Sequence, residues 1–376
     1  MRILLTTDLV GGVWRYTVTL VRELAARGHD CAVAVVGDPD PERAAELPPG
    51  VELMSRDLRL EWMPGAASDL EVGTEWLSGL ARGWKADLVH FNHFAYAIGE
   101  YAVPVVVVAH TDVRSWFVDV RGIEAPPEWD QYTELVRRGL RAADAVVAPT
   151  AYQSGRLAQH YGRTAAMVIH NGIHMPAPDP ASPPASDRPL LLVAARAWDE
   201  AKGIAMLDEA VDLLGSDAPT VHLVGPTEGP AGERIRVRNL VPHGEVPGDA
   251  MARFYDNAAV YISPSNYEPF GLTPLEAAAH GCTLLLSAIG SFRELWNEAA
   301  TFFEPQSPAD LGVRLMNLLE DPAAMDAQAA EGRARARSLY TAERMTDRYE
   351  ALYRRLTGAT GAGSAPADGQ AIRTGS

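Results

Sequence analysis

The first half of the chain alternates short apolar runs with stretches of helical period. Residues 3–6 and 31–36 predict two strands, and residues 16–27 between them place their apolar side chains on one face of a helix that Gly28 ends. Further strands are predicted at residues 87–91, 105–109, 145–148 and 166–169. Valine-rich strands that alternate with helices are typical of a parallel sheet covered on both faces.

The same alternation begins again in the second half of the chain. It follows residues 176–189, where six prolines predict a stiffened linker. From residue 308 onward the pattern is helical. The other predicted elements of this half are strands at residues 190–194, 220–224, 260–263, 283–287 and 301–303, with helices at residues 203–214, 248–258 and 272–280.

This pattern predicts an α/β protein of two Rossmann-like domains whose parallel sheets face each other across a cleft. A length of 376 residues, which is too long for a single core, agrees with two domains. The predicted organisation is a first domain at residues 1–175, a linker at 176–189, a second domain at 190–338, a C-terminal helix that crosses back to the first domain at 339–357, and a disordered tail at 358–376.

Composition narrows the classes of partner and compartment. A formal net charge of −16 repels nucleic acid and anionic lipid at long range, so nucleic acid is not an expected partner and a peripheral membrane contact has no support. The longest apolar run, residues 103–109, is too short to span a membrane. Cys31 and Cys282 lie far apart in apolar contexts, as reduced thiols do in the cytoplasmic protein that we expect.

Motifs of several other enzyme classes are absent. The chain has no G-x-G-x-x-G after its first predicted strand, no G-x-x-x-x-G-K-[ST] and no G-x-S-x-G. Asp38 and Asp40 lie in a proline-rich loop, where turn formation explains them better than metal binding. His170 and His174 flank a turn, where their spacing does not favour a metal. We therefore predict no metal site and no cofactor.

The stretch SNYEPFGLTPLE, residues 265–276, is the strongest candidate for chemistry. It follows a predicted strand, and open parallel sheets bind ligands at that edge. Glu268 lies in the loop, whereas Glu276 lies one turn inside the next predicted helix. The free amides at the start of that helix belong to Phe270, Gly271 and Leu272. Carboxylates suit hydroxyl groups and amides suit phosphates, and a sugar nucleotide carries both.

These residues resemble the E-x7-E motif of retaining glycosyltransferases with the GT-B fold, especially family 4. Other similar segments follow in the family's order: GGVWRYTVTLVRELAARGHD, VVVVAHTD, VIHNGIH, AARAWDEAKGI, LVGPTEG and HGEVPGDAMARFYDNAAVYISPS. Together they span almost the whole chain. The resemblance implies a GT-B fold and metal-independent transfer of a sugar from a nucleotide sugar to an acceptor hydroxyl, with retention. UDP-glucose or a related UDP-sugar is the first expectation for the donor and GDP-mannose the second; the acceptor stays open.

The resemblance also implies catalytic and donor-binding residues. Arg196 and Lys202 match a pair that neutralises the donor diphosphate, a role that two fixed cations suit where no metal is used. Glu268 matches the residue that contacts the transferred sugar, and His110 matches a histidine that approaches that sugar. Glu276 matches the residue that hydrogen-bonds the ribose hydroxyls of the donor.

Backbone contacts complete the donor site that the resemblance implies. The amides of Phe270, Gly271 and Leu272 would contact the sugar and phosphate. Gly11 and Gly12 would allow the backbone to approach the ligand closely, although a tight turn alone would also explain them. The backbone near Val246 matches a loop that frames the base.

Other interpretations remain open at this level. A GT-B enzyme of another reaction type, such as a sugar-nucleotide epimerase or a phosphorylase, and a non-catalytic scaffold could share the fold. Trp62 and Trp76 have no assigned role beyond core packing, although aromatic side chains near a cleft often stack on sugars. Asn92 and His93 follow a predicted strand end and are candidates for the acceptor side.

Overall fold

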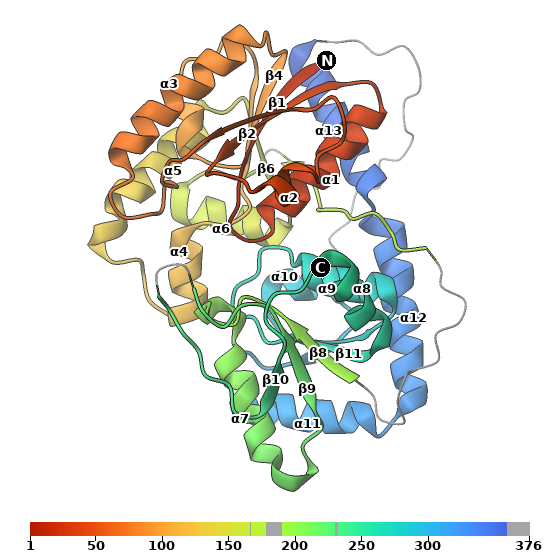
Figure 1. The fold of residues 1–376 in the computed structure, drawn as a ribbon. Coiled ribbons are helices and arrows are strands. Elements are labelled where there is room, and N and C mark those ends of the chain that lie inside the picture. The colour runs from red at the N-terminus through yellow and green to blue at the C-terminus, as the bar shows by residue number, and fades with distance from the viewer. Residues whose placement is uncertain (166, 178–189, 230–231, 359–376) are drawn as a thin grey trace, which may run out of the picture.

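The computed structural model describes residues 1–165, 167–177, 190–229 and 232–358. Within these residues the chain forms two α/β domains, each built on one parallel sheet between layers of helices (Figure 1). The prediction of two Rossmann-like domains is therefore confirmed. Most of the predicted linker, residues 178–189, and the predicted tail from residue 359 onward lie outside the described residues.

The first sheet has seven strands in the order β3-β2-β1-β4-β5-β6-β7, all parallel. Their bounds are β1 (Arg2–Asp8), β2 (Asp30–Val36), β3 (Glu52–Arg56), β4 (Leu88–Phe91), β5 (Val105–Val108), β6 (Ala145–Ala148) and β7 (Met167–Val168). The sequence pattern missed β3. This edge strand has no fully buried side chain, so it lacks the apolar run that marks the central strands.

Six helices belong to the first domain: α1 (Val13–Ala26), α2 (Pro41–Ala44), α3 (Ala67–Gly83), α4 (Val113–Trp116), α5 (Asp130–Ala142) and α6 (Ala151–Tyr161). α1 begins directly after the glycine turn and buries Leu20, Val21 and Leu24 against the sheet. The carboxylate of Asp40 caps α2 by accepting from the amide of Arg43 at 2.8 Å. The D-P-D sequence thus starts a helix.

The second sheet has six parallel strands in the order β10-β9-β8-β11-β12-β13. The strands are β8 (Leu190–Ala194), β9 (Val221–Val224), β10 (Leu240–Pro242), β11 (Ala258–Ser263), β12 (Thr283–Ser287) and β13 (Thr301–Phe303). The helices are α7 (Ile204–Leu214), α8 (Gly248–Asn257), α9 (Leu272–His280), α10 (Gly290–Trp296), α11 (Pro308–Leu319) and α12 (Pro322–Leu339). Burial raises the pKa of Cys31 in the first domain and of Cys282 in the second to about 12.

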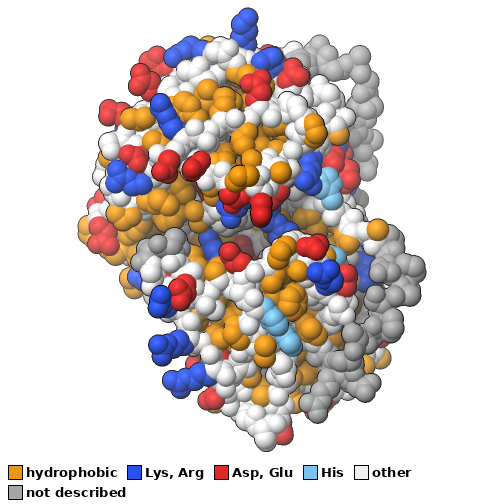
Figure 2. All heavy atoms as spheres, in the orientation of Figure 1, with side chains coloured by type: hydrophobic (Ala, Val, Ile, Leu, Met, Phe, Trp, Pro, Cys, Tyr) orange, Lys and Arg blue, Asp and Glu red, His pale blue; other side chains and the backbone are white. Residues whose placement is uncertain are grey.

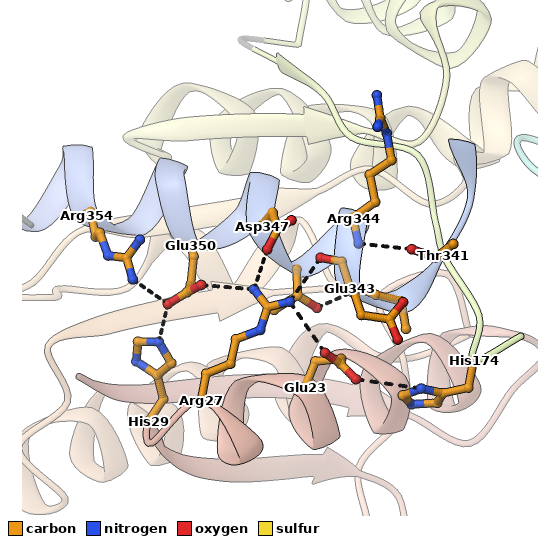
Figure 3. A network of polar contacts seen from close by, with 12 residues as sticks. Glu23, Arg27, His29, His174, Thr341, Glu343, Arg344, Asp347, Glu350 and Arg354 are labelled. Carbon is orange, nitrogen blue, oxygen red and sulfur yellow. Dashed lines mark hydrogen bonds and ion pairs between the residues drawn. The ribbon is translucent and has the colours of Figure 1, made fainter. Parts of the chain in front are cut away.

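The last helix, α13 (Ala342–Thr357), lies on the first domain against α1. Its buried face joins the core behind the first sheet through Met345, Tyr349, Leu352 and Tyr353. Figure 3 shows the polar side of this contact: Arg27, which caps the C-terminal end of α1, pairs with Asp347 at 2.7 Å and with Glu350 at 2.9 Å, and His29 pairs with Glu350 at 2.8 Å. The first and last helices are therefore joined by both packing and charge.

Two segments of the chain pass between the domains side by side. The amide of Ile173 donates to the carbonyl of Tyr340 at 3.1 Å, and the amide of Ala342 donates to the carbonyl of Ile173 at 2.9 Å. Gly172 lies so close to the carbonyl of Thr341 that any Cβ would overlap it. Among the described helices, none combines the length and apolarity that a bilayer crossing requires.

Candidate functional site

The loop after β8 carries the two candidate cations. Arg196 is held there by its neighbours, because the amide of Ala195 donates to the carbonyl at the end of β9 at 2.9 Å and the amide of Ala197 donates to a carbonyl two residues beyond β9 at 2.8 Å. Lys202 ends a short 3₁₀ turn, Glu200–Lys202, whose first amides Asp199 caps. The next residue is a glycine with φ of +66° that packs on the carbonyl of Pro264, where a side chain would clash. The loop after β8 thus lies against the loop after β11.

Both cations are paired with carboxylates at this edge of the sheet. The Nζ of Lys202 lies 2.6 Å from the Oε2 of Glu268, and the Nη2 of Arg196 lies 2.9 Å from the Oδ2 of Asp199. The Arg196 guanidinium also stands 5.4 Å from the ring of Trp198, a cation–π distance. The structure therefore brings Lys202 and Glu268 together from loops that are 66 residues apart along the chain, with Arg196 on the same loop as Lys202.

The start of α9 presents the amides predicted to accept an anion. Gly271 precedes the helix with φ of +90°, a conformation that favours glycine. Among the described residues, no protein acceptor binds the amides of Phe270, Gly271 or Leu272. These orphan donors and the helix dipole make this end of α9 favourable for a phosphate or sugar oxygen.

Glu276 lies inside α9 and is buried. Tyr255 of α8 donates to its Oε2 at 3.0 Å, and burial together with this carboxylate raises the pKa of Tyr255 well above its usual range, so the phenol stays a donor. The second partner comes from the first domain: Arg15 of α1 places its Nη2 2.7 Å from Oε1 and its Nη1 3.2 Å from Oε2. The sequence analysis missed both partners.

The glycine turn of the first domain contacts this site directly. Gly11 has φ of +74°, and a Cβ there would stand 3.2 Å from the Nη1 of Arg196. A Cβ on Gly12 would stand 3.3 Å from the Cδ1 of Leu272. The glycine turn thus lies against Arg196 and Leu272 of the second domain, and the positive φ of Gly11 favours glycine there. Arg15 follows three residues later, in the first turn of α1.

His110 lies just beyond β5, held by a buried network. Asn92 donates its amide hydrogens to the carbonyl of Thr6 at 2.7 Å and the hydroxyl of Thr17 at 3.1 Å. Its Oδ1 therefore accepts from the Nε2 of His110 at 2.9 Å and lies 3.3 Å from the Nε2 of His90. This orients the His110 ring with Nδ1 as its lone-pair atom. Asn92 is thus a positioning residue for His110.

Burial controls the protonation of both histidines in this network. It lowers the pKa of His90 to about 4 and that of His110 to about 3, helped for His110 by the neighbouring rings of His90 and His93. In the unfolded chain both rings titrate near pH 6.5. Between pH 6.5 and about 4 the unfolded state therefore binds protons that the folded state does not, and stability is lost as the pH falls.

We expect the melting temperature to fall as the pH is lowered from 7 to 5, and to fall less steeply in His110→Gln, which lacks one of the two titrating rings. Thermal unfolding at half-unit pH steps measures both slopes. His174→Gln is the control, because the His174 side chain is 43% exposed, next to Ile173 on the segment that passes between the domains, and is not a buried ring. If the His110→Gln slope equals that of the wild type, His110 is not buried as a neutral ring.

The segment after His110 touches the loop that carries Glu268. The hydroxyl of Tyr267 accepts from the amide of Asp112 at 3.2 Å and from the hydroxyl of Thr111 at 3.3 Å. Tyr267 is buried, and it is adjacent in sequence to Glu268. His110 and Glu268 thus lie on two segments in contact across the domains. Tyr267 is a further site residue that sequence reasoning missed.

The structure also places Val246 and the four residues to which the sequence assigned no role, namely Trp62, Trp76, Asn92 and His93. His93 is buried, with its Nδ1 3.1 Å from the hydroxyl of Thr6, so it does not line an open surface. Trp76 packs on the first core, whereas Trp62 is 39% exposed. Val246 is half-buried beside α8 in the second domain. Asn92, the fourth, supports His110 as described.

Figure 2 shows a recess between the two domains, with basic and acidic side chains gathered around it. The residues described above come from both domains: the glycine turn, Arg15 and His110 from the first, and the residues after β8 and β11 from the second. The arrangement offers cations and orphan amides for phosphates beside carboxylates for hydroxyls. It fits a ligand that carries both kinds of group.

Comparison with known proteins agrees with this arrangement. Residues 10–175 match the family model Glycosyltransferase Family 4, and residues 188–321 match the family model Glycosyl transferases group 1. Two similar curated proteins are the glycogen synthase of Mycobacterium tuberculosis, 26% identical over 88% of this chain and 87% of that protein, and the D-inositol 3-phosphate glycosyltransferase of Streptomyces scabiei, 26% identical over 79% and 75%.

Solved structures share the whole fold. Sucrose-phosphate synthase from Thermosynechococcus elongatus superposes with a TM-score of 0.81 at 20% identity, over 96% of this chain and all of that one. Anabaena HepE in complex with UDP-glucose superposes with a TM-score of 0.72 at 17% identity, over 94% and 99%. The fold is therefore GT-B. The two family models together cover most of the chain, and the protein belongs to the family 4 glycosyltransferases, with a group 1 second domain.

Proposed function

We propose that this glycosyltransferase moves a sugar from a UDP-sugar to an acceptor hydroxyl, with retention of the anomeric configuration and without a metal. The observation that carries the proposal is the pair of Lys202 and Glu268, with Arg196 on the same loop as Lys202, next to the orphan amides of α9. The choice of uracil as the base is supported by HepE, whose structures contain UDP and UDP-glucose. Glu276 would hold the ribose, as the family resemblance implies.

The cations would act on the leaving group. As the bond between the sugar and the diphosphate breaks, negative charge grows on the phosphate oxygens, and fixed donors placed there stabilise the transition state. Lys202 and Arg196 are already oriented by Glu268 and Asp199, so little reorganisation is needed. Arg196 can offer two parallel donors, whereas Lys202 is a compact point charge.

Two carboxylates beside the proposed leaving group are each paired with a cation. Glu268 pairs with Lys202, and Asp199 pairs with Arg196. Pairing lowers the nucleophilicity of a carboxylate, which supports a route without a covalent enzyme intermediate. In that route the acceptor oxygen attacks on the face that the diphosphate leaves, and a phosphate oxygen of the leaving group takes the acceptor proton. Retention follows because both events share one face.

The stereochemistry provides the direct test of this function. The purified protein is incubated with UDP-glucose, and proton NMR follows the first anomer formed, before mutarotation equilibrates it. We expect UDP to be released together with a product in the α configuration of the donor. A β product would contradict the proposed mechanism. Release of ADP from ADP-glucose or of GDP from GDP-mannose, with no release of UDP from UDP-glucose, would correct the donor.

Metal independence gives a separate prediction. Because two protein cations are placed for the diphosphate, turnover of UDP-glucose should be unchanged in a large excess of EDTA. Asp40, one half of the D-P-D sequence, is engaged in capping α2. Initial rates with EDTA, and with EDTA followed by excess manganese, measure the effect. Activity that disappears with the chelator and returns with manganese would overturn the metal-free mechanism.

We infer that the acceptor enters beside the glycine turn. A cavity of about 410 Å³ lies at the carboxyl ends of β1, β2 and β3, and Val10, the residue before Gly11, is part of its lining. Its apolar lining includes Leu9, Val10, Leu58, Leu60 and Met63. Arg59 binds Asp69 through two parallel contacts of 2.9 and 3.2 Å and holds the pKa of that carboxyl at about 2, so it is not free for a phosphate. Asp57 leaves the lining net negative.

The cavity therefore suits an uncharged acceptor with an apolar part more than an anion such as the inositol phosphate in a relative's name. We expect p-nitrophenyl glucoside to stimulate UDP release more than glucose 6-phosphate does. Met63→Arg should lower that stimulation at least about tenfold, while the Kd for UDP stays within about twofold. The control is Leu213→Arg, because Leu213 is an exposed apolar residue of α7 in the other domain. Equal stimulation of Met63→Arg and wild type would place the acceptor elsewhere.

A further inference from the structure

The Glu276 carboxylate is saturated almost completely by protein donors. Arg15 contributes two hydrogen bonds, at 2.7 and 3.2 Å, and Tyr255 contributes one at 3.0 Å. A carboxylate offers about four acceptor positions in total. Only one position is therefore open, and a ribose that donates from both its 2′ and 3′ hydroxyls needs two.

One existing contact must open for the ribose to bind both hydroxyls, and the structure indicates which one. Tyr255 is buried between α8 and α9, and among the described residues its hydroxyl donates to Glu276, so loss of this contact would leave a buried phenol unpaired. Arg15 is 54% exposed in its side chain and stands on the first turn of α1. Its guanidinium can return to water, and the ribose hydroxyls can take its place on the buried carboxylate.

The Arg15–Glu276 pair also joins the two domains. Arg15 belongs to the first domain and Glu276 to the second, 261 residues apart, and the pair lies beside the contacts that Gly11 and Gly12 make with Arg196 and Leu272. Exchange of Arg15 for a ribose would replace a bond between the domains with a bond to the ligand. Binding of the nucleotide would thus be linked to the contact between α1 and α9.

We propose that Arg15 is a latch residue that competes with the ribose of the nucleotide for Glu276, so that the first domain limits the affinity of the second for its donor. The latch rests on the proposed function, in which Glu276 is the ribose acceptor. It makes a specific demand on the ligand: a ribonucleotide displaces Arg15, whereas a 2′-deoxyribonucleotide, with one hydroxyl, uses the open acceptor position. Arg15 therefore reduces the preference for ribose over deoxyribose.

The test compares the Kd values of UDP and 2′-deoxy-UDP by calorimetry. The ratio of the Kd of 2′-deoxy-UDP to the Kd of UDP measures the preference for ribose, and it removes the contribution of the diphosphate, which both ligands share. We expect this ratio to rise at least about threefold in Arg15→Leu relative to wild type. Arg22→Leu is the matched control, because Arg22 is exposed on the same helix and donates only to the carbonyl of Glu46, and it should leave the ratio unchanged.

Glu276→Gln separates the latch from the function on which it rests. A wild-type preference for UDP that Glu276→Gln removes supports the ribose assignment, and an unchanged or smaller ratio in Arg15→Leu then overturns the latch alone. If Glu276→Gln keeps the wild-type ratio, the ribose assignment fails and the latch fails with it. If UDP does not bind, the same comparison is made with ADP or GDP and the corresponding 2′-deoxy nucleotide. If UDP, ADP and GDP all fail to bind, both proposals are overturned.

Discussion

Replacing Lys202 with alanine should lower kcat at saturating donor by about 10²–10³-fold, which corresponds to roughly 3–4 kcal/mol of transition-state stabilisation. The Nζ of Lys202 is fixed by Glu268 at 2.6 Å on the edge of the sheet where we place the leaving diphosphate. Charge on that diphosphate increases as the bond breaks, so the loss should appear mainly in kcat. Part should also appear in KM, because the donor is charged before reaction.

The composition of the chain provides a rare control for this experiment. The sequence has only two lysines, Lys85 and Lys202, among 33 basic residues. Lys85→Ala removes the other lysine charge from an exposed turn of the first domain and should leave kcat unchanged. Lys202→Ala should also keep the melting temperature close to that of the wild type, since the side chain lies at the recess and outside the four large apolar cores. An unchanged kcat would remove Lys202 from the leaving-group site.

The fold could be predicted where burial makes a strand apolar throughout. Central strands such as β5, VVVV, and β8, LLLVA, are covered on both faces and are evident in the sequence. The edge strands β3 and β10 were missed for the opposite physical reason. β3 has no buried residue and is partly polar, and β10 is only three residues long with Leu240 alone buried, so neither carries a long apolar run. An edge strand is paired on one side only and needs less apolar sequence.

The candidate site could be predicted for residues whose neighbours lie close in sequence. Glu268, the amides of Phe270–Leu272 and Glu276 all belong to one loop and one helix, so their common edge followed from a strand–loop–helix pattern. Arg15 was missed because its partner is 261 residues away in the other domain. Its one signal is its position, three residues after Gly12 and in the first turn of a helix whose start faces the recess.

Tyr255 and Tyr267 were missed because an aromatic residue in an apolar pattern indicates core packing. Both are buried, and the pattern is correct on that point. Only the structure shows that the hydroxyl of each reaches a functional neighbour, Glu276 in one case and the segment after His110 in the other. Sequence spacing does not determine where a phenol oxygen points, since that depends on the packing of two elements.

The second large effect is expected at Glu276. Glu276→Ala should weaken binding of UDP and of UDP-glucose by the same factor, about 10- to 100-fold, because both ligands share the ribose. Loss of a charged hydrogen-bond acceptor is worth roughly 1.5–3 kcal/mol. The carboxylate is buried and already oriented by Tyr255, so no other group of the loop replaces it. Isothermal titration of both ligands into the variant and the wild type measures the two factors.

Glu268→Ala is the comparison for Glu276→Ala, because the two variants should differ in their effect on binding of UDP. Glu268 pairs with Lys202 and, in the proposed function, contacts the transferred sugar. Its loss should therefore weaken binding of UDP-glucose while leaving binding of UDP nearly unchanged or slightly tighter, because Lys202 is then free for the phosphates. The two carboxylates would thus separate the nucleotide from the sugar. If both variants lose UDP to the same extent, the loss reflects a disordered loop, and the assignment of ribose to Glu276 and of sugar to Glu268 is wrong.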